Sequence, residues 1–293
     1  GKSVIVGDAF KDKSEELLRA MGRAVHSLDG SYITAEDSGT KEKDMRIIAE
    51  ETPYVVGMRD SDCPLGGDPS PVTAYGVFVG IKAAVNRRFG KNTVKGLTVA
   101  VQGLGAVGYD LCRYLHEEGT SLIVTDIREE TLAKATEEFE NLTVVKSDEI
   151  FSVKADIFAP CALGAQINEK TIPLLKVAIV AGAANNQLAT QKDGEELALK
   201  NILYVPDYVI NAGGVISACY EYFLRIGSNP FSHDLTRENL VAHVERIGPT
   251  ITKILNIAEA RKITPGQAAD ELAEAIFNGK DSHISQGQLS KTG

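Results

Sequence analysis

The feature that most constrains the fold of this chain is a glycine-rich turn with glycines at positions 103, 105 and 108. Residues 97–101 before it are apolar and rich in valine, which is typical of a buried parallel strand. The residues after it have apolar side chains at helical spacing. A second apolar run follows and ends at Asp126. A G-x-G-x-x-G turn between a strand and a helix, with an acid closing the next strand, predicts a dinucleotide-binding unit.

Each glycine of the turn has its own predicted role. Gly103 permits the tight turn, Gly105 lets a pyrophosphate approach the backbone, and Gly108 lets helix and strand pack closely. The N-terminus of the helix supplies free N–H groups and partial positive charge for the phosphates. A purely structural glycine-rich turn is the alternative. The predicted cofactor contacts in this segment are Gly103, Leu104, Gly105, Ala106, Val107, Gly108, Asp126 and Ile127.

The acid at the end of the second strand bears on which cofactor binds. Asp126 would accept hydrogen bonds from the adenosine ribose and repel a 2′-phosphate, which favours NAD over NADP. Arg128 argues in the other direction, because a nearby arginine can accept a 2′-phosphate.

Length, charge and cysteine usage exclude several classes of function. The 293 residues are 43% hydrophobic, which suffices for about two domains. The net charge of −9 argues against a nucleic-acid or membrane partner, and no apolar run is long enough to span a bilayer. The first residues do not resemble a signal peptide. Four widely spaced cysteines indicate reduced thiols rather than disulfides or zinc, so we expect a cytoplasmic protein without a metal site.

The order of predicted elements indicates an α/β fold with a doubly wound parallel sheet. Strands are expected over residues 97–101, 121–125, 142–145, 156–159, 177–181 and 202–205. Upstream of them we expect a strand over 3–6, a helix over 14–28, a short strand over 32–34, a helix over 41–50, an exposed loop over 60–71 and a long helix over 72–89.

These elements predict a Rossmann-type NAD domain over residues 71–215 and a partial α/β substrate domain that includes residues 1–70. Residues 216–278 would form a helical hinge and return helices. The polar residues 279–293 would be a disordered tail.

Six blocks of sequence carry a family resemblance. They read GKSVI from residue 1, YITAED from 32, DPSPVTAYG from 68, APCALG from 159, GAANNQ from 182 and DYVINAGG from 207. In this order they resemble the amino-acid dehydrogenases of the glutamate/leucine/phenylalanine/valine superfamily, and its leucine dehydrogenases in particular. The resemblance implies NAD-dependent oxidative deamination of an L-amino acid to a 2-oxo acid and ammonium. It also implies a homo-oligomer, from a dimer to an octamer.

The same resemblance implies roles for individual residues. Lys2 matches the catalytic base, and Asp37 matches the acid that moves protons at the amine. Cys161 is expected to contact the cofactor without acting as a nucleophile. The further implied cofactor contacts are Thr73, Cys161, Ala162, Asn185 and Asn211, and the implied substrate contacts are Ala35, Asn186, Val215 and Ala218.

The chemistry explains why such a reaction needs a lysine and an aspartate. The amine must be neutral before hydride leaves, because an ammonium group has no lone pair with which to form an iminium ion. Water then attacks the iminium carbon, and a base must take its proton. A lysine can be that base near neutral pH where burial or a neighbouring cation disfavours its charge. No metal is required, because the cofactor carries the redox step.

The chain departs from the family pattern at its start. Family members carry a further segment upstream of the catalytic lysine, with a second lysine that grips the substrate carboxylate. Either the sequence is part of a longer chain, or the protein lacks that segment and binds NAD without strong activity.

The predicted pocket residues favour an apolar substrate. Leucine dehydrogenases tend to carry valine where Ala218 stands, and the smaller side chain of alanine would admit phenylalanine or tryptophan. Ala35 argues in the other direction, because it keeps the base of the predicted pocket as it is in leucine dehydrogenases. One methylene discriminates between substrates by only about 1–3 kcal/mol. Leucine and other branched-chain amino acids are therefore favoured, with aromatic amino acids as the alternative. A 2-hydroxy-acid dehydrogenase is a weaker alternative, because it needs a histidine–acid pair and none of the five histidines stands in such a block.

Overall fold

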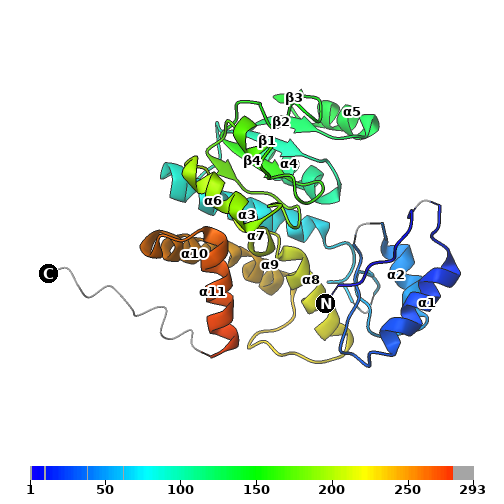
Figure 1. The fold of residues 1–293 in the computed structure, drawn as a ribbon. Helices are drawn as coiled ribbons and strands as arrows, with labels where there is room; N and C mark the ends of the chain where they lie inside the picture. The colour runs from blue at the N-terminus through cyan, green and yellow to red at the C-terminus, as the bar shows by residue number, and fades with distance from the viewer. Residues whose placement is uncertain (1, 10, 38, 62, 280–293) are drawn as a thin grey trace. The chain divides into compact units, whose positions relative to one another are not determined.

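The computed structural model describes residues 2–9, 11–37, 39–61 and 63–279. The chain divides into two compact units (Figure 1). The first unit comprises Gly1–Val72 and Gly213–Val244, and the second comprises Thr73–Ala212 and Glu245–Gly293. The first boundary is close to the predicted one after residue 70. The later boundaries differ from the prediction, because residues 213–244 cluster with the N-terminal segment.

Six parallel strands form the sheet of the second unit (Figure 1). Its order is β3-β2-β1-β4-β5-β6, which is the doubly wound order of a Rossmann-type fold. The strands are β1 (Thr98–Gln102), β2 (Ser121–Thr125), β3 (Leu142–Val144), β4 (Ile157–Pro160), β5 (Ile179–Val180) and β6 (Leu203–Tyr204). The predicted fold class is confirmed, with small shifts at the strand ends. The order in which strands are added to the sheet reverses between β1 and β4. In sheets of this kind, ligands bind beside this reversal point, at the carboxyl ends of the strands.

Helices and apolar side chains bury this sheet. The helices of the second unit are α3 (Ser70–Phe89), α4 (Ala106–Glu117), α5 (Glu129–Glu138), the 3₁₀ helix η1 (Ile172–Leu174), α6 (Gln191–Leu199), α7 (Asp207–Ile210), α10 (Ile247–Arg261) and α11 (Pro265–Phe277). α4 packs against β1 and β2, and α6 packs against β6. Ala100, Phe158 and Val180 of three neighbouring strands share a buried cluster with Leu197 of α6. This packing holds the carboxyl ends of β1 and β4 in fixed positions next to each other.

The first unit has a smaller helical core. It contains α1 (Glu15–His26), α2 (Glu42–Ala49), α8 (Gly213–Arg225) and α9 (Arg237–Glu245). Leu18 of α1 packs against Met45 and Ile48 of α2. The predicted helices over 14–28 and 41–50 are confirmed, whereas the short strand at 32–34 is reduced to a single bridge between Thr34 and Val55.

Two predictions for the first unit were wrong. Residues 3–6 do not form a strand, and Val6 is 96% exposed. A strand requires a neighbour to pair with, and no described strand lies beside this segment. The loop over 60–71 is not generally exposed, since Cys63 is only 1% exposed and Leu65 is also buried. Its Cys63 thiol points to the carbonyl oxygen of Glu221 in α8, which accounts for the burial.

Two features concern the chain as a whole. Within the described residues, no helix is both long enough and apolar enough to cross a membrane. The predicted disordered tail over 279–293 lies outside the described residues except for Gly279.

A buried charge network connects α8 to the loop in the first unit. The Glu221 carboxylate accepts hydrogen bonds from the backbone N–H groups of Gly57 (2.9 Å) and Met58 (3.1 Å). The Arg225 Nε group also donates to it, at 2.9 Å. Arg225 pairs in turn with Asp60 at 2.9 Å. Because buried charges are stable only when paired and hydrogen-bonded, this network fixes the loop against α8.

We expect Glu221→Ala to lower the free energy of unfolding of the first unit by about 3–5 kcal/mol. The change leaves Arg225 and the backbone N–H groups of Gly57, Met58 and Gly67 without their buried acceptor. Urea denaturation followed by circular dichroism and limited proteolysis measures the loss. Glu195→Ala, at an exposed position of α6, is the matched control and should change stability by no more than about 0.5 kcal/mol. Equal behaviour of the two variants would contradict the role of Glu221.

Candidate active site

The predicted phosphate-binding turn lies where β1 ends and α4 begins. Gly103 has a φ of +93°, and a Cβ atom there would come within 2.9 Å of the Ala162 Cβ. A Cβ atom at Gly108 would come within 2.0 Å of the Gly103 carbonyl oxygen. The structure therefore requires glycine at both positions, one for the conformation of the turn and the other for the approach of α4 to it.

Gly105 has different surroundings. No atom lies within 4 Å of the place that its Cβ would take. Gly105 is the N-cap residue of α4, with a φ of −65°, and it has no side-chain cap. The first backbone N–H groups of α4, which include those of Ala106 and Val107, therefore remain available to an anion. Leu104 is buried and could contact a cofactor only through its backbone.

Asp126 follows β2 and is tied to the same turn. Its Oδ2 atom accepts a hydrogen bond from the Leu104 N–H at 2.6 Å, and its Oδ1 atom accepts one from the Arg128 N–H at 2.8 Å. Burial raises the pKa of the Asp126 carboxyl, but these hydrogen bonds and the Arg128 guanidinium outweigh it and lower that pKa. Asp126 is therefore a carboxylate at neutral pH. The neighbouring Ile127 is 91% exposed and offers an apolar surface.

The residues that follow β4 belong to the same edge of the sheet. Cys161 and Ala162 come directly after this strand, and Ala162 is the neighbour that excludes a side chain at Gly103. Burial raises the pKa of the Cys161 thiol to about 12, so it stays protonated at neutral pH. A protonated thiol is a poor nucleophile, and the contact of Cys161 with the cofactor stays a prediction.

The predicted asparagines are connected to one another. The Asn211 Nδ2 group donates to the Asn185 Oδ1 atom at 2.7 Å and to the Ala183 carbonyl oxygen at 3.0 Å. Asn186, the predicted substrate contact, has a φ of +51°, which asparagine tolerates better than most residues. The loop after β5 and the end of α7 are thereby held in one arrangement.

Sequence reasoning missed two buried residues that support this loop. The Gln187 Nε2 group donates to the carbonyl oxygens of Gly182 (2.7 Å) and Ala184 (3.0 Å). Its backbone N–H donates to the Asp207 Oδ2 atom at 2.7 Å. Gln187 and Asp207 therefore position the asparagines beside them. Gln187 ends the block GAANNQ and Asp207 begins the block DYVINAGG. These positions are the signal from which the sequence could have identified both residues.

The predicted proton-transfer residues lie together in the first unit. The Lys2 Nζ atom is 2.6 Å from the Asp37 Oδ2 atom, and the two side chains are 63% and 53% exposed. A contact of 2.9 Å between the Ser3 and Tyr32 hydroxyl groups holds the adjoining backbone. An exposed ion pair contributes only about 0–1 kcal/mol to stability. Both charged groups remain accessible to a substrate.

The other predicted residues divide between the two units. Val215 and Ala218 lie three residues apart on α8 and so share one face of that helix. Val215 is exposed, whereas Ala218 and Ala35 are half-buried. These three belong to the first unit, and Thr73 lies in the first turn of α3 in the second unit. Their contacts with substrate and cofactor stay predictions.

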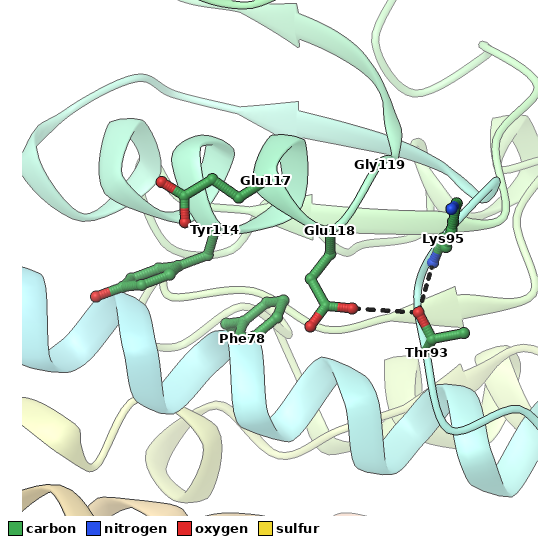
Figure 2. A pocket seen from close by; sticks show the side chains of 7 residues that line it. All are labelled: Phe78, Thr93, Lys95, Tyr114, Glu117, Glu118 and Gly119. Atoms are coloured by element: carbon green, nitrogen blue, oxygen red, sulfur yellow. Dashed lines mark hydrogen bonds between the residues drawn. The ribbon is translucent and has the colours of Figure 1, made fainter.

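One open depression of the second unit lies away from the glycine turn of the same unit. Figure 2 shows the side chains that line it, which are Phe78, Thr93, Lys95, Tyr114, Glu117, Glu118 and Gly119. Glu118 accepts a hydrogen bond from the Thr93 hydroxyl at 3.1 Å. The lining includes the turns that lead into β1 and β2, at the amino ends of those strands, whereas dinucleotides bind at the carboxyl ends. The depression is therefore separate from the candidate cofactor site.

Metal-binding side chains do not gather in the described part of the chain. Over these residues, no group of three or more His, Cys, Asp or Glu side chains could hold a metal ion.

Comparison with known families gives two matches. The family described as Glutamate/Leucine/Phenylalanine/Valine dehydrogenase matches residues 122–275. The family described as Glu/Leu/Phe/Val dehydrogenase, dimerisation domain, matches residues 1–54. Together they include the predicted proton-transfer residues and most of the second unit.

Individual relatives are similar over nearly the whole chain. The leucine dehydrogenase of Bacillus cereus is 47% identical over 98% of this chain and 76% of its own length. That of Thermoactinomyces intermedius is 50% identical over 94% of this chain and 72% of its own length. The crystal structure of L-tryptophan dehydrogenase from Nostoc punctiforme is similar with a TM-score of 0.74 at 43% identity, over 92% of this chain and 75% of that one. A hetero-hexameric glutamate dehydrogenase from Thermus thermophilus shares the fold at 20% identity, with a TM-score of 0.71.

Two glycine substitutions should separate ligand contact from folding. Gly105→Ala adds a methyl group to open space, so the melting temperature should not change, while NADH affinity should fall by about 10-fold or more because the methyl group occupies the predicted pyrophosphate position. Gly108→Ala should lower the melting temperature and the affinity together, because its methyl group collides with the Gly103 carbonyl. Fluorescence titration and thermal melts measure both quantities. Unchanged NADH binding by Gly105→Ala would exclude this turn as the phosphate site.

Proposed function

This chain belongs to the Glu/Leu/Phe/Val dehydrogenase family, and we propose that it oxidatively deaminates an L-amino acid to a 2-oxo acid and ammonium with NAD as the hydride acceptor. Leucine and other branched-chain amino acids are the proposed substrates, in line with the leucine dehydrogenases at 47–50% identity. The observation that carries the proposal is the 2.6 Å contact between the Lys2 ammonium and the Asp37 carboxylate, inside the segment that matches the family. An amino-acid dehydrogenase of this kind needs such a pair to move protons.

The residues of the second unit fit a dinucleotide. Gly105 leaves open space at an uncapped helix N-terminus, which suits a pyrophosphate, and Asp126 presents a carboxylate, which suits ribose hydroxyl groups. Thr73, Cys161, Ala162, Asn185 and Asn211 are the further residues proposed to hold the nicotinamide half. NAD, when bound, accepts the hydride from the substrate α-carbon.

The residues of the first unit are proposed to handle the protons. Asp37 holds the substrate ammonium group and takes its proton, so that the amine becomes neutral. Lys2 first gives the proton of its ammonium group to solvent, to which it is exposed, and the neutral amine then takes the proton of the water molecule that attacks the iminium carbon. Because the two side chains are already in hydrogen-bond contact, a proton can pass between them without another carrier. Ala35, Asn186, Val215 and Ala218 are proposed to contact the substrate.

Assembly and location follow the family. The match of residues 1–54 to a dimerisation domain supports a homo-oligomer of this chain. The free cysteines among the described residues support a reducing compartment, and we propose the cytoplasm.

An aromatic substrate is the second candidate. L-tryptophan dehydrogenase from Nostoc punctiforme is 44% identical over 95% of this chain. The small side chain of Ala218 on α8 would leave room for a ring.

Lys2→Ala should abolish amino-acid-dependent NADH formation and leave NADH affinity unchanged, because it removes the base and leaves the dinucleotide site intact. Absorbance assays with leucine, valine, phenylalanine and tryptophan measure turnover, and fluorescence titration measures binding. Lys11→Ala removes a different exposed lysine of the same segment and should keep full activity. Turnover by Lys2→Ala at the wild-type rate would refute the role of Lys2. No turnover of any of these amino acids by the wild-type protein would refute the proposed reaction.

Ala218→Val should shift the preference towards leucine. Two added methyl groups narrow the proposed pocket, so the ratio of kcat/KM for leucine to that for phenylalanine should rise by about 10-fold, within the range expected for small changes of apolar volume. Steady-state kinetics with both amino acids measure this ratio. Ala198→Val, on α6 of the second unit, is a control outside the pocket. An unchanged ratio would remove Ala218 from the substrate pocket.

A further inference from the structure

A row of lysines precedes three neighbouring strands of the sheet. Lys154, Lys176 and Lys200 each stand three residues before the first residue of their strand, which is β4, β5 and β6 in turn. These strands are adjacent in the sheet. Lys154 and Lys176 form an isolated parallel bridge, so their backbones lie side by side. Lys200 and Lys176 are equally far from the paired residues Leu203 and Ile179. The sheet therefore places three cations in register at its amino edge.

A depression of about 440 Å³ lies at this edge. The three lysines line it together with Arg88, which lies near the end of α3. These four residues are called the basic cluster below. The same lining contains one carboxylate, that of Asp156. The depression therefore carries three net positive charges, in a chain whose net charge is −9.

Two polar groups of this depression are held in place by hydrogen bonds. The Arg88 Nη1 group donates to the Asn201 Oδ1 atom at 2.9 Å, and its Nη2 group donates to the Asn201 carbonyl oxygen at 2.7 Å. A guanidinium has five N–H donors, so three remain for a ligand. The Asp156 Oδ2 atom accepts a hydrogen bond from the Thr98 N–H at 2.8 Å. The arginine is therefore fixed in advance, and the carboxylate serves the start of β1.

Helix ends explain only half of the basic cluster. Arg88 lies in the last turn of α3 and Lys200 is the C-cap residue of α6, where cations stabilise a helix. The Lys200 Nζ atom also donates to the Pro173 carbonyl oxygen at 3.4 Å. Lys154 and Lys176 belong to no helix, and like charges at opposed positions of two strands are destabilising.

No acidic side chain compensates for this repulsion. Within the described residues, none of the four cations of the basic cluster forms an ion pair. Arg87, the neighbour of Arg88 on α3, does pair with Glu259. An external anion would therefore remove a repulsion that the described part of the chain leaves in place.

We propose that the basic cluster binds a linear polyphosphate anion. Neighbouring strands lie about 4.8 Å apart, so three lysines in register extend over roughly 10 Å, which suits a chain of phosphates better than a single one. Lysine attracts phosphate as a point charge, and the guanidinium fork of Arg88 matches phosphate oxygens. The lining has no aromatic ring on which a base could stack, so recognition is confined to the phosphates.

This inference is independent of the proposed function. The basic cluster lies at the amino ends of the strands, whereas the glycine turn lies at the carboxyl end of β1. A polyphosphate and a dinucleotide should therefore bind without competing.

The test is calorimetric titration with inorganic triphosphate, in phosphate-free buffer at fixed low ionic strength. For Lys154→Gln/Lys176→Gln we expect the Kd to rise about 10-fold or more, because two charged hydrogen-bond donors are lost. Lys200→Gln alone should weaken binding by a smaller factor. Without the anion, the double variant should melt at or above the wild-type temperature, because it removes the repulsion between opposed lysines.

The matched control is Lys91→Gln/Lys95→Gln. It removes the same charge from exposed positions before β1, where the Lys95 side chain lies beside Gly119. Its Kd for triphosphate should stay within about twofold of the wild-type value, since salt screens charges that do not contact the ligand. Orthophosphate should bind the wild type about 10-fold more weakly than triphosphate, and ATP should bind no more tightly than triphosphate.

Other outcomes would overturn the inference. Equal weakening by the two double variants would show only a general attraction between charges, and no binding of triphosphate by the wild type would refute the site. Tighter binding of ATP than of triphosphate would refute recognition through phosphates alone. Displacement of triphosphate by NADH would place the anion at the glycine turn. Failure of NADH to bind would refute the proposed function, while the lysine variants would still test the basic cluster.

Discussion

The close approach of α4 to β1 is the constraint on which the cofactor site depends. Gly108 lies so near the Gly103 carbonyl that no side chain fits between them, and Gly103 is packed in the same way against Ala162 after β4. These two contacts bring the helix N-terminus and the ends of β1 and β4 to one place. Gly105 between them faces no such neighbour. One turn therefore combines tight packing at Gly103 and Gly108 with open space at Gly105, and a phosphate-binding loop requires both.

Most of the fold could be predicted because the sequence pattern within each strand or helix is enough to identify it. The central strands β1, β4 and β5 are short apolar runs buried on both faces, and this pattern is visible in the sequence without knowledge of their partners. Residues 3–6 have the same apolar pattern, but a strand also needs a neighbour, and pairing is a property of distant segments. The loop over 60–71 was mistaken for an exposed one for a similar reason. Its polar composition is local, whereas Glu221, which holds the preceding residues, lies far along the chain.

The candidate site was predictable to the extent that its residues belong to motifs. The glycine turn and Asp126 follow from spacing, and Lys2 and Asp37 follow from family blocks. The buried Gln187 and Asp207 were missed, as was the half-buried Arg225 of the first unit, because a polar residue of this kind is recognised only through its partners. A glutamine or an arginine in sequence looks like a surface residue. Its function as a support becomes visible when the carbonyl and carboxylate groups around it are known.

The division of the chain has a consequence for how this protein can change specificity. The backbone passes from one unit to the other after Val72, after Ala212 and after Val244. Two of these crossings adjoin proposed contacts, since Thr73 follows the first and Asn211 precedes the second. The first unit, which holds most of the proposed substrate contacts, is therefore assembled from separated stretches of the gene. Exchange of one contiguous stretch between relatives cannot transfer that unit whole, so new substrate preferences are more accessible through point changes on α8 than through recombination.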